Sequence, residues 1–342
     1  MPALLWILVA VLLAAPAGAQ TFPGSDVPLG TAPDAQEAVR PAQPAQPARL
    51  RDPSSPVAKQ LFGAAAGPSP LAARAIGFYS RGCLAGARPL AIDGAAWQAM
   101  RLSRNRFWGH PILVALVERL AKDAQRLDGW PGLLVGDMSQ PRGGPMLTGH
   151  ESHQIGLDAD IWLTPMPPRR LSAQEREELS ATSMLGADQL TVDPQIWSEG
   201  HVRLIKRAAG YPEVERILVH PGIKKALCSA ASEFGPDRAW LGKVRPYWGH
   251  HYHMHVRLQC PPNSPECRPQ APTTTDDGCG KELVDWFALL SRPPPRVPAP
   301  PKPPLTLADL PVECRVVIDA SGSGAARLRA PAQAPTAQGS AR

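Results

Sequence analysis

Apolar residues recur at intervals of three and four over residues 111–127, a pattern formed by Ile112, Leu113, Leu116, Val117 and Leu120. This spacing predicts an amphipathic helix. Shorter patterns predict helices over residues 172–185, 203–209 and 223–232, and Ser172 suits the first turn of the earliest one. Continuously apolar runs over residues 132–136 and 216–219 predict short buried strands.

Two further segments alternate in polarity with the period of a strand. Residues 157–163 place Asp158, Asp160 and Trp162 on one face. Residues 251–258 place His251, His253, His255 and Arg257 on one face of the predicted strand. Tyr252, Met254, Val256 and Leu258 lie on the other face. The elements together predict an α+β fold, with a single domain whose mainly antiparallel sheet is flanked by helices and long disulfide-tied loops.

The composition changes near both ends of the chain. The 41 prolines are concentrated between residues 22 and 56 and between residues 293 and 304. We therefore expect a Pro/Ala-rich linker at residues 20–57, a folded domain at 58–290 and a Pro-rich, disordered arm at 291–342. Residues 3–15 form an uncharged apolar run, and Ala17-Gly18-Ala19 supplies a small-x-small cleavage site. These features predict a signal peptide at residues 1–19.

The predicted signal lacks the usual Lys or Arg before its apolar run, so a retained membrane helix is the alternative interpretation. The run is shorter than the ~20 residues that a bilayer span needs, which favours export to the periplasm without stable membrane insertion. A net charge of +6 and a pI near 9.1 suit an anionic polymer such as cell wall or nucleic acid. No basic run with interleaved aromatic residues is present, so nucleic acid is not an expected partner, and no feature specifies an oligomeric state.

Six cysteines in an exported chain predict three disulfides, for which fifteen connectivities exist. Cys260 and Cys267 flank a turn-rich Pro-Pro-Asn-Ser-Pro segment and could close a small loop. A zinc site built from cysteines is the alternative. The chain contains no Cys-x-x-Cys pair, which favours disulfides.

Histidines gather in two clusters about a hundred residues apart. The first contains His150 and His153 and is followed by Asp160, and the second contains four histidines, His250, His251, His253 and His255. Neutral imidazole and carboxylate are the ligands that a catalytic zinc prefers. The spacing His-x6-Asp with a distant His-x-His differs from the helical zinc-peptidase signature, whose histidines are four residues apart, and this makes Glu151 a poor candidate for the base of that signature.

Longer stretches surround these clusters. They are residues 136–144, which read Gly-Asp-Met-Ser-Gln-Pro-Arg-Gly-Gly, residues 149–154 continuing to 160–163, and residues 240–260. On these stretches the chain resembles the penicillin-insensitive murein endopeptidases, which belong to the lysostaphin/D-Ala-D-Ala-type metallopeptidases. The resemblance extends over about residues 77–287, and the block at residues 245–260 is far more specific than a bare His-x-His.

The resemblance implies a set of site residues. It implies zinc ligands at His153, Asp160 and His255, with His150 as a further ligand, and catalytic roles for His250 and His253. Asp188 matches the aspartate of a second metal position, but Thr191 stands where that position would have its histidine. The resemblance also implies three disulfides, which pair Cys83 with Cys314, Cys228 with Cys279, and Cys260 with Cys267.

The resemblance implies a zinc endopeptidase that hydrolyses the D-Ala–meso-diaminopimelate amide between peptidoglycan stem peptides. Insensitivity to β-lactams is then expected, because those drugs trap a serine as an acyl-enzyme and a metallopeptidase forms none. His253 or His250, with an ordinary pKa near ~6.5, would move the proton. Arg142 could hold a substrate carboxylate or be a plain surface residue.

Two alternative functions remain. One is a D,D-carboxypeptidase or dipeptidase acting on free stem peptides. The other is a wall-binding module whose zinc is structural, with a closed site of four protein ligands.

Overall fold

The computed structural model describes residues 55–273, 275–292 and 302–321, all within one compact unit. The predicted signal peptide at 1–19, most of the predicted linker at 20–57 and the last residues of the predicted arm lie outside them. The α-helices are α1 (Ala58–Gly63), α2 (Pro111–Asp128), α3 (Ala173–Glu178), α4 (Glu199–Gly210), α5 (Pro221–Ala230), α6 (Lys281–Leu290) and α7 (Glu313–Asp319). The 3-10 helices are η1 (Leu102–Arg104), η2 (Ala231–Phe234), η3 (Ala239–Lys243) and η4 (Leu307–Asp309).

A six-stranded sheet lies at the centre, in the order β4-β6-β7-β10-β8-β9. Its strands are β4 (Trp97–Ala99), β6 (Leu133–Val135), β7 (Asp158–Trp162), β8 (Val214–Val219), β9 (Val244–Pro246) and β10 (His253–Leu258). The three central pairings are antiparallel, and only the outer pairs β4–β6 and β8–β9 are parallel. The predicted α+β fold with a mainly antiparallel sheet is confirmed.

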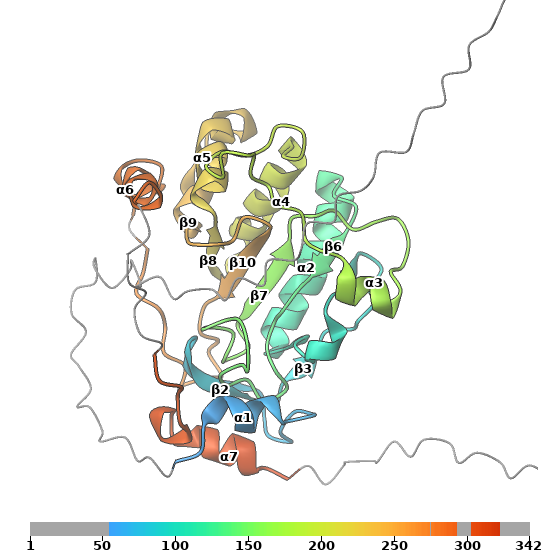
Figure 1. The fold of residues 1–342 in the computed structure, drawn as a ribbon, viewed down its shortest axis with the longest axis vertical. Coiled ribbons are helices and arrows are strands. Elements are labelled where there is room, and N and C mark those ends of the chain that lie inside the picture. Colours follow the sequence, from blue (N-terminus) through green and yellow to red (C-terminus); the bar gives the residue numbers. More distant parts are fainter. Residues whose placement is uncertain (1–54, 274, 293–301, 322–342) are drawn as a thin grey trace, which may run out of the picture. The chain divides into compact units, whose positions relative to one another are not determined.

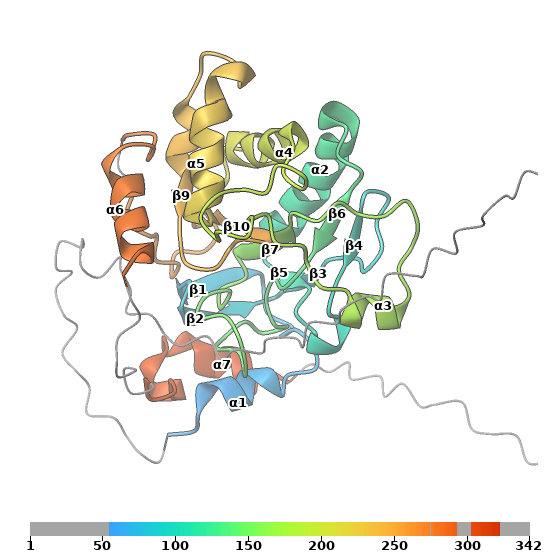
Figure 2. The same cartoon turned by 45° about the horizontal axis from the view of Figure 1, so that its top comes forward.

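One face of this sheet carries the main hydrophobic core. Alternate residues of the two middle strands, including Ala159, Ile161, Met254 and Val256, are fully buried in one cluster with side chains of α2 and α4. Both helices cover this face in Figures 1 and 2. Burying one large aliphatic side chain contributes about 1.5–3 kcal/mol, so the core face fixes the register of the strands. The polar residues that alternate with them along these strands therefore lie on the opposite face of the sheet.

Helix α2 follows its prediction closely. It begins with Pro111 in the first turn after His110, whose side chain accepts the Ile112 N–H. It ends at Gly129, which adopts φ 69°, a left-handed conformation that glycine tolerates without strain.

Three other predicted boundaries were wrong. Helix α3 ends at Glu178 rather than near residue 185, because Thr164 Oγ1 accepts the Thr182 N–H and Ser183 Oγ accepts the Leu185 N–H, bonds that replace a helical ladder. Helix α4 begins at Glu199, earlier than predicted, after the cap residue Ser198. Strand β10 begins at His253 rather than at residue 251, because the chain turns at Gly249 and His250 with positive φ.

A second layer lies beneath the β1–β2 hairpin. The hairpin consists of β1 (Arg74–Phe78) and β2 (Arg81–Ala85), and a small two-stranded sheet of β3 (Arg88–Pro89) and β5 (Trp108–Gly109) follows it. Figures 1 and 2 both place α1 and α7 side by side below β2. The residues of this layer form a separate hydrophobic cluster that includes Phe62, Ile76, Leu307, Leu310 and Val317.

The position of α7 corrects the predicted C-terminal arm. Residues 302–321 were expected to be disordered, yet they contain η4 and α7, and Leu307, Leu310 and Val317 are buried. The apolar residues of this segment supply enough buried surface to order it against β2. Its Pro-rich neighbours dominate the composition and hide that pattern.

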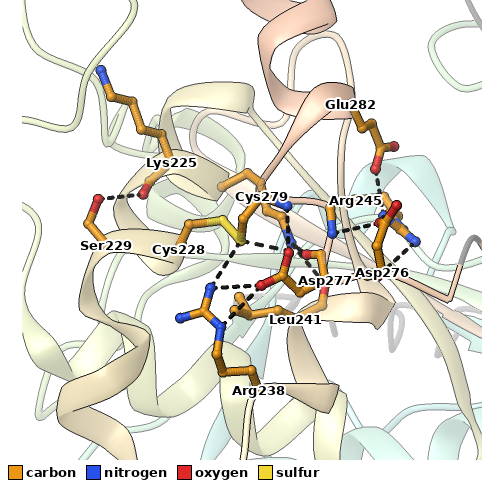
Figure 3. The surroundings of a disulfide bond; sticks show 12 residues. Lys225, Cys228, Ser229, Arg238, Leu241, Arg245, Asp276, Asp277, Cys279 and Glu282 are labelled. Carbon is orange, nitrogen blue, oxygen red and sulfur yellow. Dashed lines mark hydrogen bonds and ion pairs between the residues drawn. A yellow bond between two sulfur atoms is a disulfide. The ribbon is translucent and has the colours of Figure 1, made fainter.

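All six cysteines form disulfides, in the three predicted pairs Cys83–Cys314, Cys228–Cys279 and Cys260–Cys267. Figure 3 shows the second pair, which joins α5 to the segment before α6, with Asp277 between Cys279 and Arg238. Arg238 donates to the Asp277 carboxylate at 2.7 Å and lies 3.6 Å from Cys279 Sγ. Within the described ranges, no helix is both long and apolar enough to cross a bilayer.

The Cys83–Cys314 bond is expected to contribute most of the disulfide stabilisation. It spans 231 residues, whereas Cys260–Cys267 spans 7, and closing a longer loop removes more entropy from the unfolded chain. Replacing both cysteines of the long pair by serine should cost about 5 kcal/mol of unfolding free energy, against about 2 kcal/mol for the short pair. Urea unfolding of the two double variants measures the difference. Equal losses would contradict the expectation.

Candidate metal centre

The centre is built on β7 and β10, which are antiparallel neighbours in the middle of the sheet. Their register sets three pairs opposite one another, His255 with Asp160, Arg257 with Asp158, and His253 with Trp162. Side chains two positions apart on a strand share a face, so all of them lie on the face that the hydrophobic core leaves free. Every residue of both strands is buried.

His153 reaches this face from the loop before β7. Its backbone adopts φ 65°, a strained conformation for a non-glycine residue that costs about 1–3 kcal/mol. Two hydrogen bonds hold it there: Ser139 Oγ donates to the His153 carbonyl at 2.7 Å, and the His153 N–H donates to Asp158 at 2.9 Å. The ring Nδ1 lies 2.6 Å from the Met138 carbonyl, which assigns the proton to Nδ1 and leaves the lone pair on Nε2.

Asp160 is the common neighbour of the histidines. Its carboxylate oxygens lie 3.0 Å from His255 Nδ1, 3.4 Å from His153 Nε2, 3.5 Å from His150 Nδ1 and 3.6 Å from His253 Nε2. Burial acts to raise the pKa of Asp160, but the surrounding imidazoles, led by His253 and His153, hold this pKa well below its usual value. The carboxylate is therefore ionised at neutral pH.

His150 is oriented by a second buried carboxylate, Asp137. His150 Nε2 lies 3.0 Å from Asp137 Oδ2, so its Nδ1 faces Asp160. The same oxygen accepts from Arg106 at 2.9 Å and from Arg104 at 3.1 Å. Burial raises the pKa of Asp137, but the His150 hydrogen bond and the two arginines outweigh it and lower this pKa well below normal.

Asp158 holds other residues of the site in place. It is fully buried and receives both arms of the Arg257 guanidinium, at 2.7 and 3.1 Å. His255 Nε2 lies 3.3 Å from Asp158, so both ring nitrogens of His255 face carboxylates. Burial lowers the pKa of His255, but Asp158 and Asp160 outweigh it and raise this pKa above its usual value.

His250 and His253 lie next to each other beside the centre, with ring centroids 4.8 Å apart. His250 Nδ1 lies 2.5 Å from the Trp248 carbonyl, which leaves its Nε2 as the acceptor. Burial lowers the pKa of His253 to about 4 and lowers the pKa of His250 well below normal. Both rings are therefore neutral at neutral pH, which corrects the expectation of an ordinary value near ~6.5.

His150, His153 and Asp160 form a group that could hold a metal ion, since one donor atom from each lies within 4.8 Å of the others. His153 Nε2 is buried and makes no hydrogen bond to any described residue. A buried imidazole nitrogen with its lone pair unused fits a metal ligand better than a core residue. His255 adjoins the group through its 3.0 Å contact with Asp160.

Other residues singled out in the sequence lie elsewhere. Asp188 is exposed and accepts from Thr191 Oγ1 at 2.6 Å, a hydrogen bond that helps lower its pKa to about 2, and it belongs to no ligand group within the described ranges. His251 contacts Ser183 Oγ at 3.0 Å instead of sharing the face of His253. Arg142 caps the end of α7, donating to the Val317 carbonyl at 2.9 Å. The idea that Arg142 holds a substrate carboxylate was therefore wrong.

Comparison with known proteins matches this chain to a described family. Residues 75–319 match the family described as penicillin-insensitive murein endopeptidase. A protein of that name from Pectobacterium atrosepticum is 42% identical over 246 residues, covering 72% of this chain and 84% of its own length. Others are 45% identical in Haemophilus influenzae, over 62% of this chain and 72% of that protein, and 44% in Yersinia enterocolitica, over 72% and 86%.

The chain belongs to the penicillin-insensitive murein endopeptidase family. The predicted resemblance is confirmed and is wider than expected, since the match continues to residue 319 and so includes α7. The family match also contains both histidine clusters and Asp160.

Sequence reasoning gave no role to two carboxylates of this murein endopeptidase family member. Asp137 orients His150, and Asp158 fixes the backbone of His153 and the ring of His255. A signal for Asp158 was present, because alternation places it on the face of Asp160. The signals for Asp137 are its position just after a buried strand and its place in the stretch 136–144 that carries the resemblance.

Proposed function

We propose that this protein is a zinc-dependent murein endopeptidase that hydrolyses the D-Ala–meso-diaminopimelate cross-link of peptidoglycan. The observation that carries the proposal is the group His150, His153 and Asp160, found in a chain that belongs to the murein endopeptidase family. The names of the relatives supply the substrate, which is murein. The exact bond follows from the resemblance in the sequence.

The donor set suits zinc. Two imidazoles and a carboxylate make a three-ligand site that leaves one position open. His255, the other ligand predicted from sequence, adjoins the group through its 3.0 Å contact with Asp160. The hydrogen bonds from His153 Nδ1 to Met138 and from His150 Nε2 to Asp137 fix both rings, as the carbonyl and carboxylate partners of zinc-binding histidines do. Held by these residues, zinc would supply Lewis-acid chemistry at the scissile carbonyl and would make water more acidic.

The protein's own residues handle the proton. His253 and His250 are neutral at neutral pH, so each can accept a proton as the nucleophile attacks and return it to the leaving amine. The Trp248 carbonyl keeps the Nδ1 proton of His250 in place, which directs its Nε2 toward the reaction. Glu151, exposed and 4.0 Å from Lys302, is not positioned as a base.

Location in the periplasm belongs to the same proposal. Three disulfides need an oxidising compartment to form and persist, and the predicted signal peptide would deliver the chain to it. Peptidoglycan lies in that compartment. A basic chain with net charge +6 suits this anionic polymer.

The test is product analysis with two substrates. Purified mature protein is incubated with a cross-linked muropeptide dimer and, separately, with an uncross-linked pentapeptide, and the products are weighed by mass spectrometry. The proposal expects dimers to be split into monomers and the pentapeptide to remain intact. Release of the terminal D-Ala from the pentapeptide would favour the carboxypeptidase alternative, and no turnover of either would favour the wall-binding module.

A further inference from the structure

Two arginines of the turn around η1 lie at the edge of the metal centre. Arg104 uses one nitrogen, Nη1, on Asp137, the carboxylate that orients His150, and its side chain remains 47% exposed. Asp137 is already paired with the buried Arg106. The rest of the Arg104 guanidinium is therefore free to bind another anion.

Arg101 is a half-buried arginine without an acidic partner. It forms no ion pair with any described carboxylate, and its guanidinium donates to the Arg176 carbonyl at 3.4 Å. Its guanidinium lies over the Trp162 ring, 5.6 Å from the centroid. Burial lowers the pKa of Arg101, and the nearby charge of Arg104 lowers it further. The carboxylates near Arg101, those of Asp137 and Glu177, already accept from Arg104 and Ser103. A ligand anion would therefore pair with the Arg101 guanidinium directly.

The position of Trp162 ties this pair to the reaction site. Trp162 lies directly opposite His253 in the β7–β10 register and two residues beyond Asp160 on the same face. Trp162 and Asp160 are one two-residue strand step, roughly 7 Å, apart along β7. Arg101, which lies over the Trp162 ring, is therefore placed beside the metal centre.

The backbone of the turn is held in a costly conformation. Arg101 and Asn105, which flank η1, have φ 55° and 51°, in the left-handed region that an arginine rarely adopts. Ser103 fixes the turn to α3 by donating its N–H and its hydroxyl to Glu177, both at 2.8 Å. Strain of about 1–3 kcal/mol per residue persists where surrounding contacts enforce it, and such residues cluster at ligand-binding sites.

We propose that Arg101 and Arg104 bind the substrate carboxylate adjacent to the scissile amide and thereby determine specificity for it. The inference rests on the proposed function. In the D-Ala–meso-diaminopimelate link, the carbon that bears the scissile nitrogen also bears a free carboxylate. A planar guanidinium binds such a group through two parallel hydrogen bonds, and a second arginine strengthens the interaction.

The test compares two muropeptide dimers that differ only at this carboxylate, one free and one amidated. Wild-type protein should prefer the free acid in kcat/KM by about 10–100-fold, the usual effect of a hydrogen bond to a charged group. Arg101→Gln should reduce this ratio to near one while the metal content stays at the wild-type level. Arg104→Gln is a second variant, since Asp137 keeps Arg106 and His150 as partners.

Arg119→Gln is the matched control. It also removes a guanidinium from above an aromatic ring, that of Tyr211, but on α2. It should keep the wild-type preference. A wild-type ratio near one, or an unchanged ratio in both Arg101→Gln and Arg104→Gln, would overturn the inference while leaving the proposed function intact. If wild-type protein cleaves neither dimer, the proposed function is wrong and the inference fails with it.

Discussion

His153→Ala is expected to remove the bound metal and the endopeptidase activity together. The substitution deletes the buried Nε2 that faces Asp160 and keeps the backbone bonds to Ser139 and Asp158, so the loop should hold its shape. Losing one of three ligands typically removes several kcal/mol of metal affinity, which raises the dissociation constant by about 10³-fold or more. Metal content is measured by elemental mass spectrometry after dialysis.

His251→Ala is the matched control for this experiment. His251 belongs to the same histidine cluster but contacts Ser183 rather than Asp160, so this variant should keep both metal and activity. Wild-type metal content in His153→Ala would exclude His153 as a ligand. Loss of metal in both variants would indicate general damage to the site.

His253→Ala is expected to keep its metal and its fold while turnover falls by about 10²–10⁴-fold, the usual contribution of general acid–base catalysis. His253 lies on the wall of the centre beside His250, and its Nδ1 makes no hydrogen bond to the described residues. Kinetics with the cross-linked dimer, together with metal analysis of the same sample, separates proton transfer from ligation. Metal lost along with activity would make His253 a ligand, and near-normal turnover would remove it from the mechanism.

The pH dependence of kcat/KM provides a second test of the same residue. A base must be unprotonated, and burial lowers the pKa of His253 to about 4. Activity should therefore persist below pH 6.5 and fall only as the pH approaches about 4. The residual activity of His253→Ala should not show this decrease at low pH. A decrease in wild-type activity centred near pH 6.5 would instead indicate a solvent-exposed base.

Much of the centre could be predicted because strand alternation is a local property. The pattern placed Asp158 with Asp160, and His253 with His255, on single faces, and the sheet then set the two faces side by side. The predicted strand failed at His251 because the turn at Gly249 and His250 delays the start of β10. Local polarity does not reveal such a turn.

The roles that the sequence did not predict depend on contacts between distant segments. Arg142 is 175 residues from its acceptor Val317, and Arg104 is 33 residues from Asp137. Neither partner is specified by spacing or by residue type. The sequence left Arg142 as either a carboxylate-binding or a plain surface residue for this reason, and the arginines now proposed emerge only from the folded arrangement.

The most direct test of the central claim is cleavage of the cross-linked dimer before and after metal removal. Protein stripped with a chelator and dialysed should release no monomer, and adding back about one equivalent of zinc per chain should restore the original rate. The same titration applied to His153→Ala should restore nothing at that concentration. Cleavage of the dimer at the full rate by protein shown to be free of metal would contradict the account.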